Sequence, residues 1–191
     1  MDPTNLAPHT KSEIIAATED VWRSISTYLS SLTQDQFHLR PEPQLWSAAE
    51  NLEHLFMSTK PLVKALGAPK LFLKTFGRPN RPGRTYLQVR DRYQEKLSSI
   101  GGGRQVDQKE YGPVVTEESL ISEHQEKWES IGRKYPQRID SWSEKDLDAY
   151  LLPHPLLGKL MLREMLFFTV HHSYHHFGLM QDRTGIKAGG H

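Results

Sequence analysis

The stretch that decides the fold is residues 160–182, which read LMLREMLFFTVHHSYHHFGLMQD. Apolar side chains recur in it at every third or fourth position, which is the spacing of one face of an α-helix. On a helical wheel of about 100° per residue, His172 and His176 lie one turn apart at the centre of this apolar face. His171 and His175 fall toward its edge. The segment therefore predicts a buried helix that carries two histidines into the core of the protein.

Three further segments show the same helical period, at residues 12–32, 47–66 and 117–135. The second of them opens with Ser47 and Glu50, the spacing of a capping box, in which a hydroxyl and a carboxylate satisfy N–H groups at the start of a helix. No segment alternates polar and apolar residues as a half-buried strand does. Four amphipathic helices predict an all-α fold, a four-helix bundle.

A long crossover insertion connects the second and third of these helices, because residues 67–115 lie between them. Residues 79–83 contain two prolines and a glycine and predict a turn-rich loop. Residues 85–97 predict an additional helix with a poor period. Pro61 lies inside the second helix and is expected to kink it or to end it. The predicted architecture is thus a bundle in which one connection is much longer than the others.

The crossover insertion is strongly basic. Residues 67–110 hold ten Lys or Arg and four Asp or Glu, a net charge of +6, whereas the rest of the chain has 14 basic and 19 acidic residues. Our preferred interpretation is a solvated segment. The alternative is a basic lip that attracts an anionic substrate, in which case charge reversal at Arg81 and Arg84 raises KM in low salt. The glycines at 101–103 lack the Gly-Lys-Ser/Thr sequence of a phosphate-binding loop and predict no nucleotide site.

Composition excludes several classes of function. The 191 residues fit a single domain, residues 1–191, and 24 Lys or Arg against 23 Asp or Glu give a net charge of +1, which argues against a nucleic-acid partner. The chain has no cysteine, which excludes disulfides, cysteine-ligated zinc, iron–sulfur clusters and thiol nucleophiles. It shows neither a signal peptide nor an apolar run long enough to span a membrane. We therefore expect no membrane partner and a cytoplasmic protein.

The two histidines at the centre of the fourth helix are candidate metal ligands. His172 and His176 stand at positions i and i+4, so that two neutral imidazoles on one helix face can chelate one divalent ion. The alternative is a hydrogen-bonded pair packed in the core. Ser173 follows His172, so the segment is not the zincin motif, which has Glu at that position. We favour the metal, and a tight site then needs a third ligand from another helix.

Three residues are candidates for the third ligand: His54 and Glu50 in the second helix and His124 in the third. Their spacing does not choose among them, and His54 lies about 130° from the centre of the apolar arc of its helix. Glu50 is also the candidate catalytic residue, as a base or as a group that orients His54. Its place in the capping box with Ser47 favours a structural role.

Several stretches of the chain resemble the DinB-like, damage-inducible family of four-helix-bundle proteins. Residues 46–55, WSAAENLEHL, look like the second-helix signature of that family. Residues 154–158, HPLLG, followed by residues 162–166, LREML, resemble the beginning of its fourth helix. Residues 172–176, HSYHH, resemble its His-x-x-His-His segment. The stretches have the order and separation of the family pattern, and the helices that they imply cover most of the chain.

The resemblance implies that His54, His172 and His176 bind one divalent metal ion, zinc, nickel or iron, and leave coordination positions open to water or substrate. The family includes thiol-dependent S-transferases and isomerases, which use bacillithiol, mycothiol or glutathione-like cofactors, and also metal-dependent hydrolases. We therefore expect a metal-dependent enzyme of the S-transferase or hydrolase type that acts on a small molecule. A low-molecular-weight thiol would be its second cofactor.

The alternative function is non-catalytic. On this interpretation the bundle binds a partner, and the metal is structural or vestigial and ties the second helix to the fourth. The number of ligands distinguishes the two functions, because three protein ligands plus water indicate chemistry and four protein ligands indicate a structural site. A homodimer is compatible with either function, since such bundles can pair helices side by side.

Overall fold

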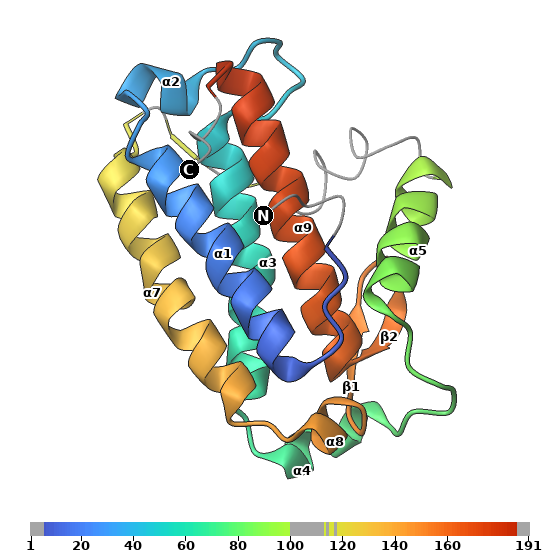
Figure 1. The fold of residues 1–191 in the computed structure, drawn as a ribbon. Coiled ribbons are helices and arrows are strands. Elements are labelled where there is room, and N and C mark those ends of the chain that lie inside the picture. The colour runs from blue at the N-terminus through green and yellow to red at the C-terminus, as the bar shows by residue number, and fades with distance from the viewer. Residues whose placement is uncertain (1–5, 100–112, 114, 117, 187–191) are drawn as a thin grey trace.

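Four long helices form the predicted bundle in a computed structural model that describes residues 6–99, 113, 115–116 and 118–186. Helix α1 packs against two of the other three, and so does α3 (Figure 1). The all-α fold class is therefore confirmed. The four helices are α1 (Lys11–Leu29), α3 (Ala48–Leu66), α7 (Ile121–Asp140) and α9 (Leu162–Thr184).

The local sequence explains where α1 and α3 begin. Thr10 precedes α1 and Ser47 precedes α3, and each hydroxyl accepts a hydrogen bond from the backbone N–H three residues on. The carboxylates of Glu13 and Glu50 in turn accept from the backbone N–H of the capping residue. The capping box predicted at Ser47 and Glu50 is confirmed, and it fixes the first turn of the helix that carries His54.

Two helices continue through a proline. α3 passes Pro61 without ending there, and α7 passes Pro136 and extends beyond the predicted end at residue 135. Buried side chains follow each proline, Leu62 in α3 and Ile139 in α7. Their burial offsets much of the about 3 kcal/mol that a proline costs inside a helix. Both helices therefore reach the same end of the bundle.

A short helix that the sequence did not predict follows α1. Thr33 caps α2 (Gln34–His38), so that α1 ends before its predicted end at residue 32. Phe37 of α2 is fully buried and anchors the segment on the bundle. A helix of five residues is too short to show a period in the sequence, which is why it was missed.

A β-hairpin precedes α9, where the sequence predicted no strand. β1 (Leu151–His154) pairs antiparallel with β2 (Gly158–Met161). α9 therefore begins at Leu162 and not at residue 160. Strands of four residues are too short to show the alternation that marks a strand, and the prediction was wrong here for that reason. The turn closes at Gly158, whose φ of +73° favours glycine.

The crossover between α3 and α7 contains one substantial helix. This helix, α5 (Tyr86–Ser99), confirms the prediction for residues 85–97 and packs against α9 on the outside of the bundle (Figure 1). The glycines at 101–103 lie outside the described residues. The remaining short segments are α4 (Lys70–Leu73) and the 3-10 turn η2 (Lys74–Phe76) in the crossover, and α8 (Glu144–Leu147) before the hairpin.

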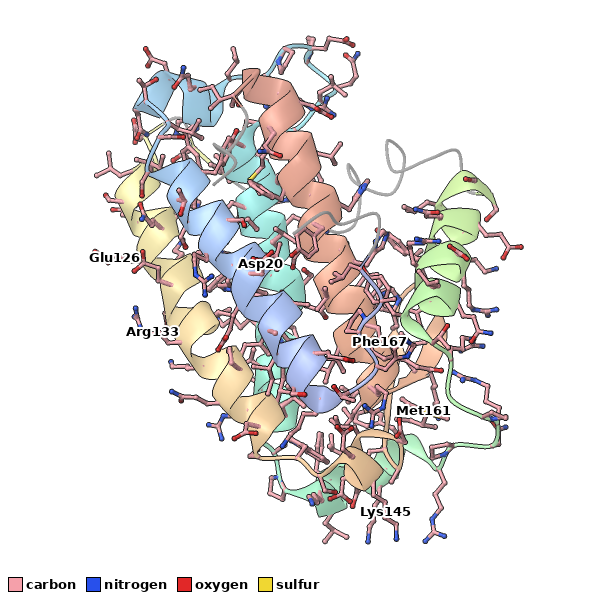
Figure 2. All side chains as sticks on the ribbon, viewed as in Figure 1. Asp20, Glu126, Arg133, Lys145, Met161 and Phe167 are labelled. Carbon is pink, nitrogen blue, oxygen red and sulfur yellow. The ribbon has the colours of Figure 1, made fainter. Side chains whose placement is uncertain are left out.

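The core is apolar and rich in aromatic rings, whereas charged side chains such as Glu126 and Arg133 point outward from α7 (Figure 2). The indoles of Trp22 in α1 and Trp128 in α7 stack with centroids 4.3 Å apart and an interplanar angle of 2°. Gly132 permits this contact, because a Cβ there would lie 2.2 Å from Cδ1 of Trp22. In the described part of the chain, no helix has the length and apolar content needed to cross a membrane.

Candidate metal centre

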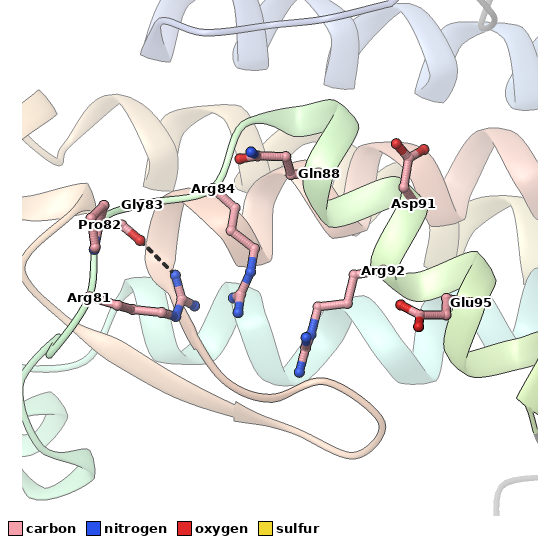
Figure 3. A pocket seen from close by; sticks show the side chains of 8 residues that line it. All are labelled: Arg81, Pro82, Gly83, Arg84, Gln88, Asp91, Arg92 and Glu95. Carbon is pink, nitrogen blue, oxygen red and sulfur yellow. Dashed lines mark hydrogen bonds between the residues drawn. The ribbon is translucent and has the colours of Figure 1, made fainter.

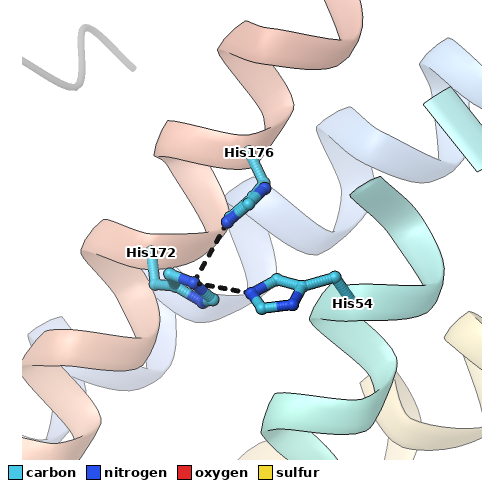
Figure 4. A group of neighbouring side chains, drawn as sticks. All are labelled: His54, His172 and His176. Atoms are coloured by element: carbon cyan, nitrogen blue, oxygen red, sulfur yellow. Dashed lines mark hydrogen bonds between the residues drawn. The ribbon is translucent and has the colours of Figure 1, made fainter. Parts of the chain in front are cut away.

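Three histidine side chains meet between α3 and α9. His54 comes from α3, and His172 and His176 come from α9, where they stand one turn apart (Figure 4). Nε2 of His172 lies 3.2 Å from Nε2 of His54 and 3.1 Å from Nε2 of His176. His172 and His176 are buried, and His54 is half-buried. The structure thus brings one histidine of α3 to the predicted pair on α9, and we call these three side chains the histidine group.

Asn51 fixes the orientation of His176. The amide Nδ2 of Asn51 donates to the carbonyl oxygens of Ser47 and Trp46, at 2.8 and 3.3 Å, which leaves its Oδ1 to face His176 as an acceptor. Nδ1 of His176 lies 2.8 Å from this oxygen and donates its proton to it. In the neutral ring the lone pair is then on Nε2, the nitrogen that faces the other two histidines.

Burial keeps His172 and His176 neutral. It lowers the pKa of His172 and the pKa of His176 well below the ordinary value of 6.5, and the neighbouring histidines lower both further. A neutral imidazole is the form that binds a metal ion, because protonation occupies the lone pair. The interior of the bundle thus holds these side chains in the state that coordination requires.

Aromatic rings from separate parts of the chain surround the histidine group. The ring centroid of Trp46, just before α3, lies 5.1 Å from that of His54. The ring of Phe168 stacks on that of His172, with centroids 4.9 Å apart. Tyr93 of α5 lies 6.0 Å from His172. His154, the last residue of β1, lies 4.2 Å from Phe168. The crossover helix and the hairpin therefore both help to enclose the group, and the surroundings are largely apolar.

The spacing of the three nitrogens fits a divalent metal ion. At metal–nitrogen distances of about 2.0–2.1 Å and angles between about 90° and 109°, two ligand nitrogens lie about 2.8–3.4 Å apart. The observed separations are 3.1 and 3.2 Å. Hydrogen bonds among the three rings would satisfy these nitrogens less well than a metal ion would. Nε2 of a neutral His172 carries one proton at most, so it can donate to only one of its two nitrogen neighbours. In the described residues, no fourth His, Asp or Glu joins the group.

The other two candidates for a third ligand have partners elsewhere. Nδ1 of His124 pairs with Oε2 of Glu53 at 3.2 Å, between α7 and α3. Glu50 accepts from the backbone N–H of Ser47 and forms an ion pair with Arg40. Neither side chain belongs to the histidine group. The cap and the ion pair are structural contacts, and a catalytic role for Glu50 stays a prediction.

The remaining histidines of α9 lie outside the group. The ring of His171 packs against Tyr86 and Tyr93 of α5, with centroids 6.4 and 6.0 Å away. His175 is exposed. The helical wheel separated these two residues from the centre of the apolar face, and the structure places them accordingly.

Periodicity did not single out His54 because the buried arc of α3 is wider than its apolar arc. Glu50 and Asn51 are only 5% and 1% exposed, so α3 buries a polar edge as well as an apolar face. Asn51 lies one turn before His54 on this edge. Sequence reasoning missed Asn51 and Trp46, although both lie in the WSAAENLEHL stretch. The available signal was the three-residue step from Asn51 to His54, which places both on one side of a helix.

A comparison with families of known proteins gives a match over most of the chain. Residues 17–180 match the DinB superfamily. The chain belongs to the DinB superfamily. The matched range begins in α1, ends in α9 and contains the whole histidine group, so the resemblance inferred from a few short stretches is confirmed for the bundle as a whole. A comparison with curated proteins gave no match.

Proposed function

We propose that this DinB-superfamily protein is a metal-dependent enzyme in which His54, His172 and His176 hold one divalent ion. The observation that carries the proposal is the convergence of three Nε2 atoms with no fourth protein ligand among the described residues. Three ligands leave positions for water or substrate, as in catalytic sites, whereas structural sites use four. Zinc, nickel and iron all accept three neutral imidazoles.

The chain supplies the surroundings of the ion, and the ion supplies the activation. A divalent ion bound there would lower the pKa of a coordinated water or thiol, and so provide hydroxide or thiolate near neutral pH. Asn51 holds the proton of His176 on Nδ1 and keeps Nε2 directed at the ion. Phe168 and Tyr93 pack around His172 and exclude bulk water from that side.

The reaction on this proposal is S-transfer to, or hydrolysis of, a small molecule. S-transfer needs a thiol from outside the chain, because the chain has no cysteine. A low-molecular-weight thiol is therefore the second cofactor of the transfer reaction. Hydrolysis needs only the coordinated water. The chain belongs to the DinB superfamily. The resemblance to that family implied S-transfer and hydrolysis, and membership therefore supports these two activities over others.

Elemental analysis of protein purified without a His tag or a nickel column tests the metal. We expect about one divalent ion per chain, since three imidazoles converge on one point. The loaded protein is then assayed with bacillithiol, mycothiol or glutathione and an aryl halide, and separately with nitrophenyl esters. Activity that is lost in His172→Ala and kept in His171→Ala supports the proposal. Stoichiometric metal without either activity, together with unfolding on chelation, favours the non-catalytic alternative, in which the metal ties α3 to α9.

Other expectations from the sequence stay predictions: a homodimer, a cytoplasmic location and one domain over residues 1–191. Sedimentation velocity tests the first of these, and we expect a species of twice the chain mass. Limited proteolysis tests the last, because a single domain gives one resistant core rather than two fragments.

A further inference from the structure

A basic pocket of about 700 Å³ lies beside α5, away from the histidine group. The loop before α5 and the first turns of α5 form it. Figure 3 shows the guanidinium groups of Arg81, Arg84 and Arg92 extending toward one region of this pocket, whereas Asp91 points to the opposite side of the helix. Three cationic groups thus share a partly enclosed space, although they come from a loop and a helix.

Arg81 is already neutralised. Its two terminal nitrogens donate to the two carboxylate oxygens of Glu164, at 2.5 and 2.6 Å. The backbone N–H of Arg84 donates to the same carboxylate at 2.8 Å, as does that of Met161 at 3.0 Å. Glu164 is fully buried at the start of α9. This arrangement, which we call the Glu164 clamp, fixes the loop and holds the backbone of Arg84 in place.

The side chains of Arg84 and Arg92 are not neutralised in this way. The guanidinium of Arg84 forms a longer ion pair, 3.6 Å from the Glu164 carboxylate that Arg81 already occupies. Nε of Arg92 is buried with no hydrogen-bond partner in the described residues. Burial lowers the pKa of Arg84, and the charges of neighbouring arginines lower it further. An anion between the guanidinium groups of Arg84 and Arg92 would accept hydrogen bonds from them and would offset the repulsion between their positive charges.

The acidic residues of the pocket do not cancel this charge. Asp91 is mostly exposed and pairs with Arg90 at 2.7 Å. Glu95 also lines the pocket and is a single carboxylate against Arg84 and Arg92. The pocket therefore keeps an excess of positive charge, and its guanidinium groups have the planar, multidentate geometry that suits carboxylates and phosphates.

Helix α5 connects the pocket to the surroundings of the histidine group. Arg92 directly precedes Tyr93, whose ring centroid is 6.0 Å from that of His172. Along α9, Glu164 of the clamp and His172 are separated by about 12 Å, from the helical rise per residue. Helix α5, which packs against α9, thus carries residues of the basic pocket and also a residue that contacts the histidine group.

We propose that Arg84 and Arg92 bind a carboxylate or phosphate group that forms the end of the substrate remote from the metal. The identity of this anion as part of a substrate rests on the function proposed above, whereas the anion site itself does not. The substrate class is then a small molecule that carries a carboxylate or phosphate group in addition to its reacting bond. The clamp at Arg81 positions the site without binding the anion.

Calorimetric titration with inorganic phosphate, and separately with succinate, tests the anion site. We expect saturable binding that weakens as salt rises, and about tenfold weaker binding in Arg92→Gln and in Arg84→Gln, because each removes a charge-assisted hydrogen bond. Lys96→Gln, at an exposed position of the same helix outside the pocket, is the matched control and should bind as the wild type does. The stronger of the two ligands identifies the source of the anion. Unsaturable binding, or equal binding by wild type and Arg92→Gln, overturns the site.

Two further measurements separate this proposal from the function on which it rests. His172→Ala should bind the probe anion as the wild type does, so that failure of the metal site leaves the anion site measurable. In the metal-loaded protein, we compare a nitrophenyl ester that ends in a carboxylate with an uncharged ester of equal length. The ratio of their kcat/KM values should fall about tenfold in Arg92→Gln and stay unchanged in Lys96→Gln. An unchanged ratio in Arg92→Gln, with anion binding lost, shows that the anion is not part of the substrate.

Discussion

Helix α9 carries two buried polar clusters about two turns apart, and they are opposites. In the Glu164 clamp, one carboxylate accepts hydrogen bonds from a guanidinium and from backbone N–H groups, so charge and geometry are both complete. In the histidine group, nitrogens that are acceptors when neutral face one another at 3.1 and 3.2 Å. The first cluster is satisfied by the chain alone. The second has the donor set of a metal site, so the function that we propose uses the histidine group, whereas the clamp contributes stability.

The two clusters also differ in how the protein shifts the pKa of the buried group. Burial by itself raises the pKa of Glu164, but the hydrogen bonds from Arg81, Arg84 and Met161 outweigh it and hold the pKa below the ordinary value. Burial lowers the pKa of His172, and the neighbouring histidines lower it further. The clamp therefore stabilises a buried charge, whereas the histidine group avoids one.

The largest effect should come from breaking the clamp. Arg81→Met removes the bidentate partner of the buried Glu164 carboxylate and leaves it with backbone donors and the longer ion pair to Arg84. We expect the free energy of unfolding to fall by about 3–5 kcal/mol. Urea denaturation measures it. Arg133→Met, which removes an exposed ion pair with Glu129 at 3.7 Å, is the control and should change stability by less than about 1 kcal/mol. Similar losses in the two variants would mean that the clamp contributes no more than a surface pair.

The pH dependence of the clamp has a definite sign. The pKa of Glu164 is lower in the folded protein than in the unfolded chain, so its contribution is present above the unfolded value and is lost as pH falls through the folded one. Stability of the wild type should therefore decline on acidification more steeply than that of Glu164→Gln. Charge reversal at Arg81 is a poor test of substrate attraction by the basic segment, because it would also break the clamp. The resulting loss of stability would obscure any change in KM.

The second effect concerns metal binding. His172→Ala and His176→Ala should each weaken binding at least a hundredfold and abolish stoichiometric metal, because the two remaining imidazoles bind weakly. His171→Ala should not, since that ring packs against α5 instead. Mass-spectrometric metal analysis of protein dialysed against a weak chelator measures both. Full retention of metal by His172→Ala would place the ion elsewhere.

The third effect concerns the support of His176. Asn51→Leu removes the acceptor that holds the proton of His176 on Nδ1, and metal affinity should fall about 10–100-fold. Asn51→Asp keeps an oxygen there and should bind metal nearly as well as the wild type. Competition with a chromophoric chelator gives both affinities. Equal losses in the two variants would show that packing, not the hydrogen bond, matters at this position.

The last effect concerns a histidine next to the group. Burial lowers the pKa of His171 to about 4, so the unfolded chain binds a proton at this residue that the folded protein does not. The metal-free protein should lose stability as pH falls below about 6.5, and this contribution should level off near pH 4. His171→Phe should reduce the slope by part of the about 1.4 kcal/mol per pH unit that one proton gives. Unfolding curves over this pH range measure the slope, and an unchanged slope would contradict the assignment.

The contrast between the two clusters also explains what the sequence could predict. The pair on α9 was visible because a four-residue step on an apolar face is a local pattern. The partner from α3 was not, since the choice among His54, Glu50 and His124 depends on how three helices pack. Only the family resemblance selected His54. The Glu164 clamp was missed entirely, because its donors lie about 80 residues away along the chain.

The fold followed the same rule. Long segments with a sustained period, such as residues 12–32 and 47–66, gave helices within a few residues of their predicted ends. The hairpin and α2 were missed because a segment of four or five residues carries no period, and their stability comes from burial of side chains such as Phe37 and Leu160. Tertiary packing also carried α7 past Pro136.

Three of the four tryptophans are placed to report separately on unfolding and on the metal. Trp22 and Trp128 lie face to face across α1 and α7, so their excited states couple and their emission changes when these helices part. Trp46 is instead 5.1 Å from the ring of His54, where a paramagnetic ion such as nickel would quench it. Unfolding and loss of metal can therefore be followed by fluorescence in the same sample. The Trp46→Phe variant removes the metal-dependent signal and so identifies which change belongs to which event. The order in which the two signals change tells whether the ion leaves a folded bundle or departs with its collapse.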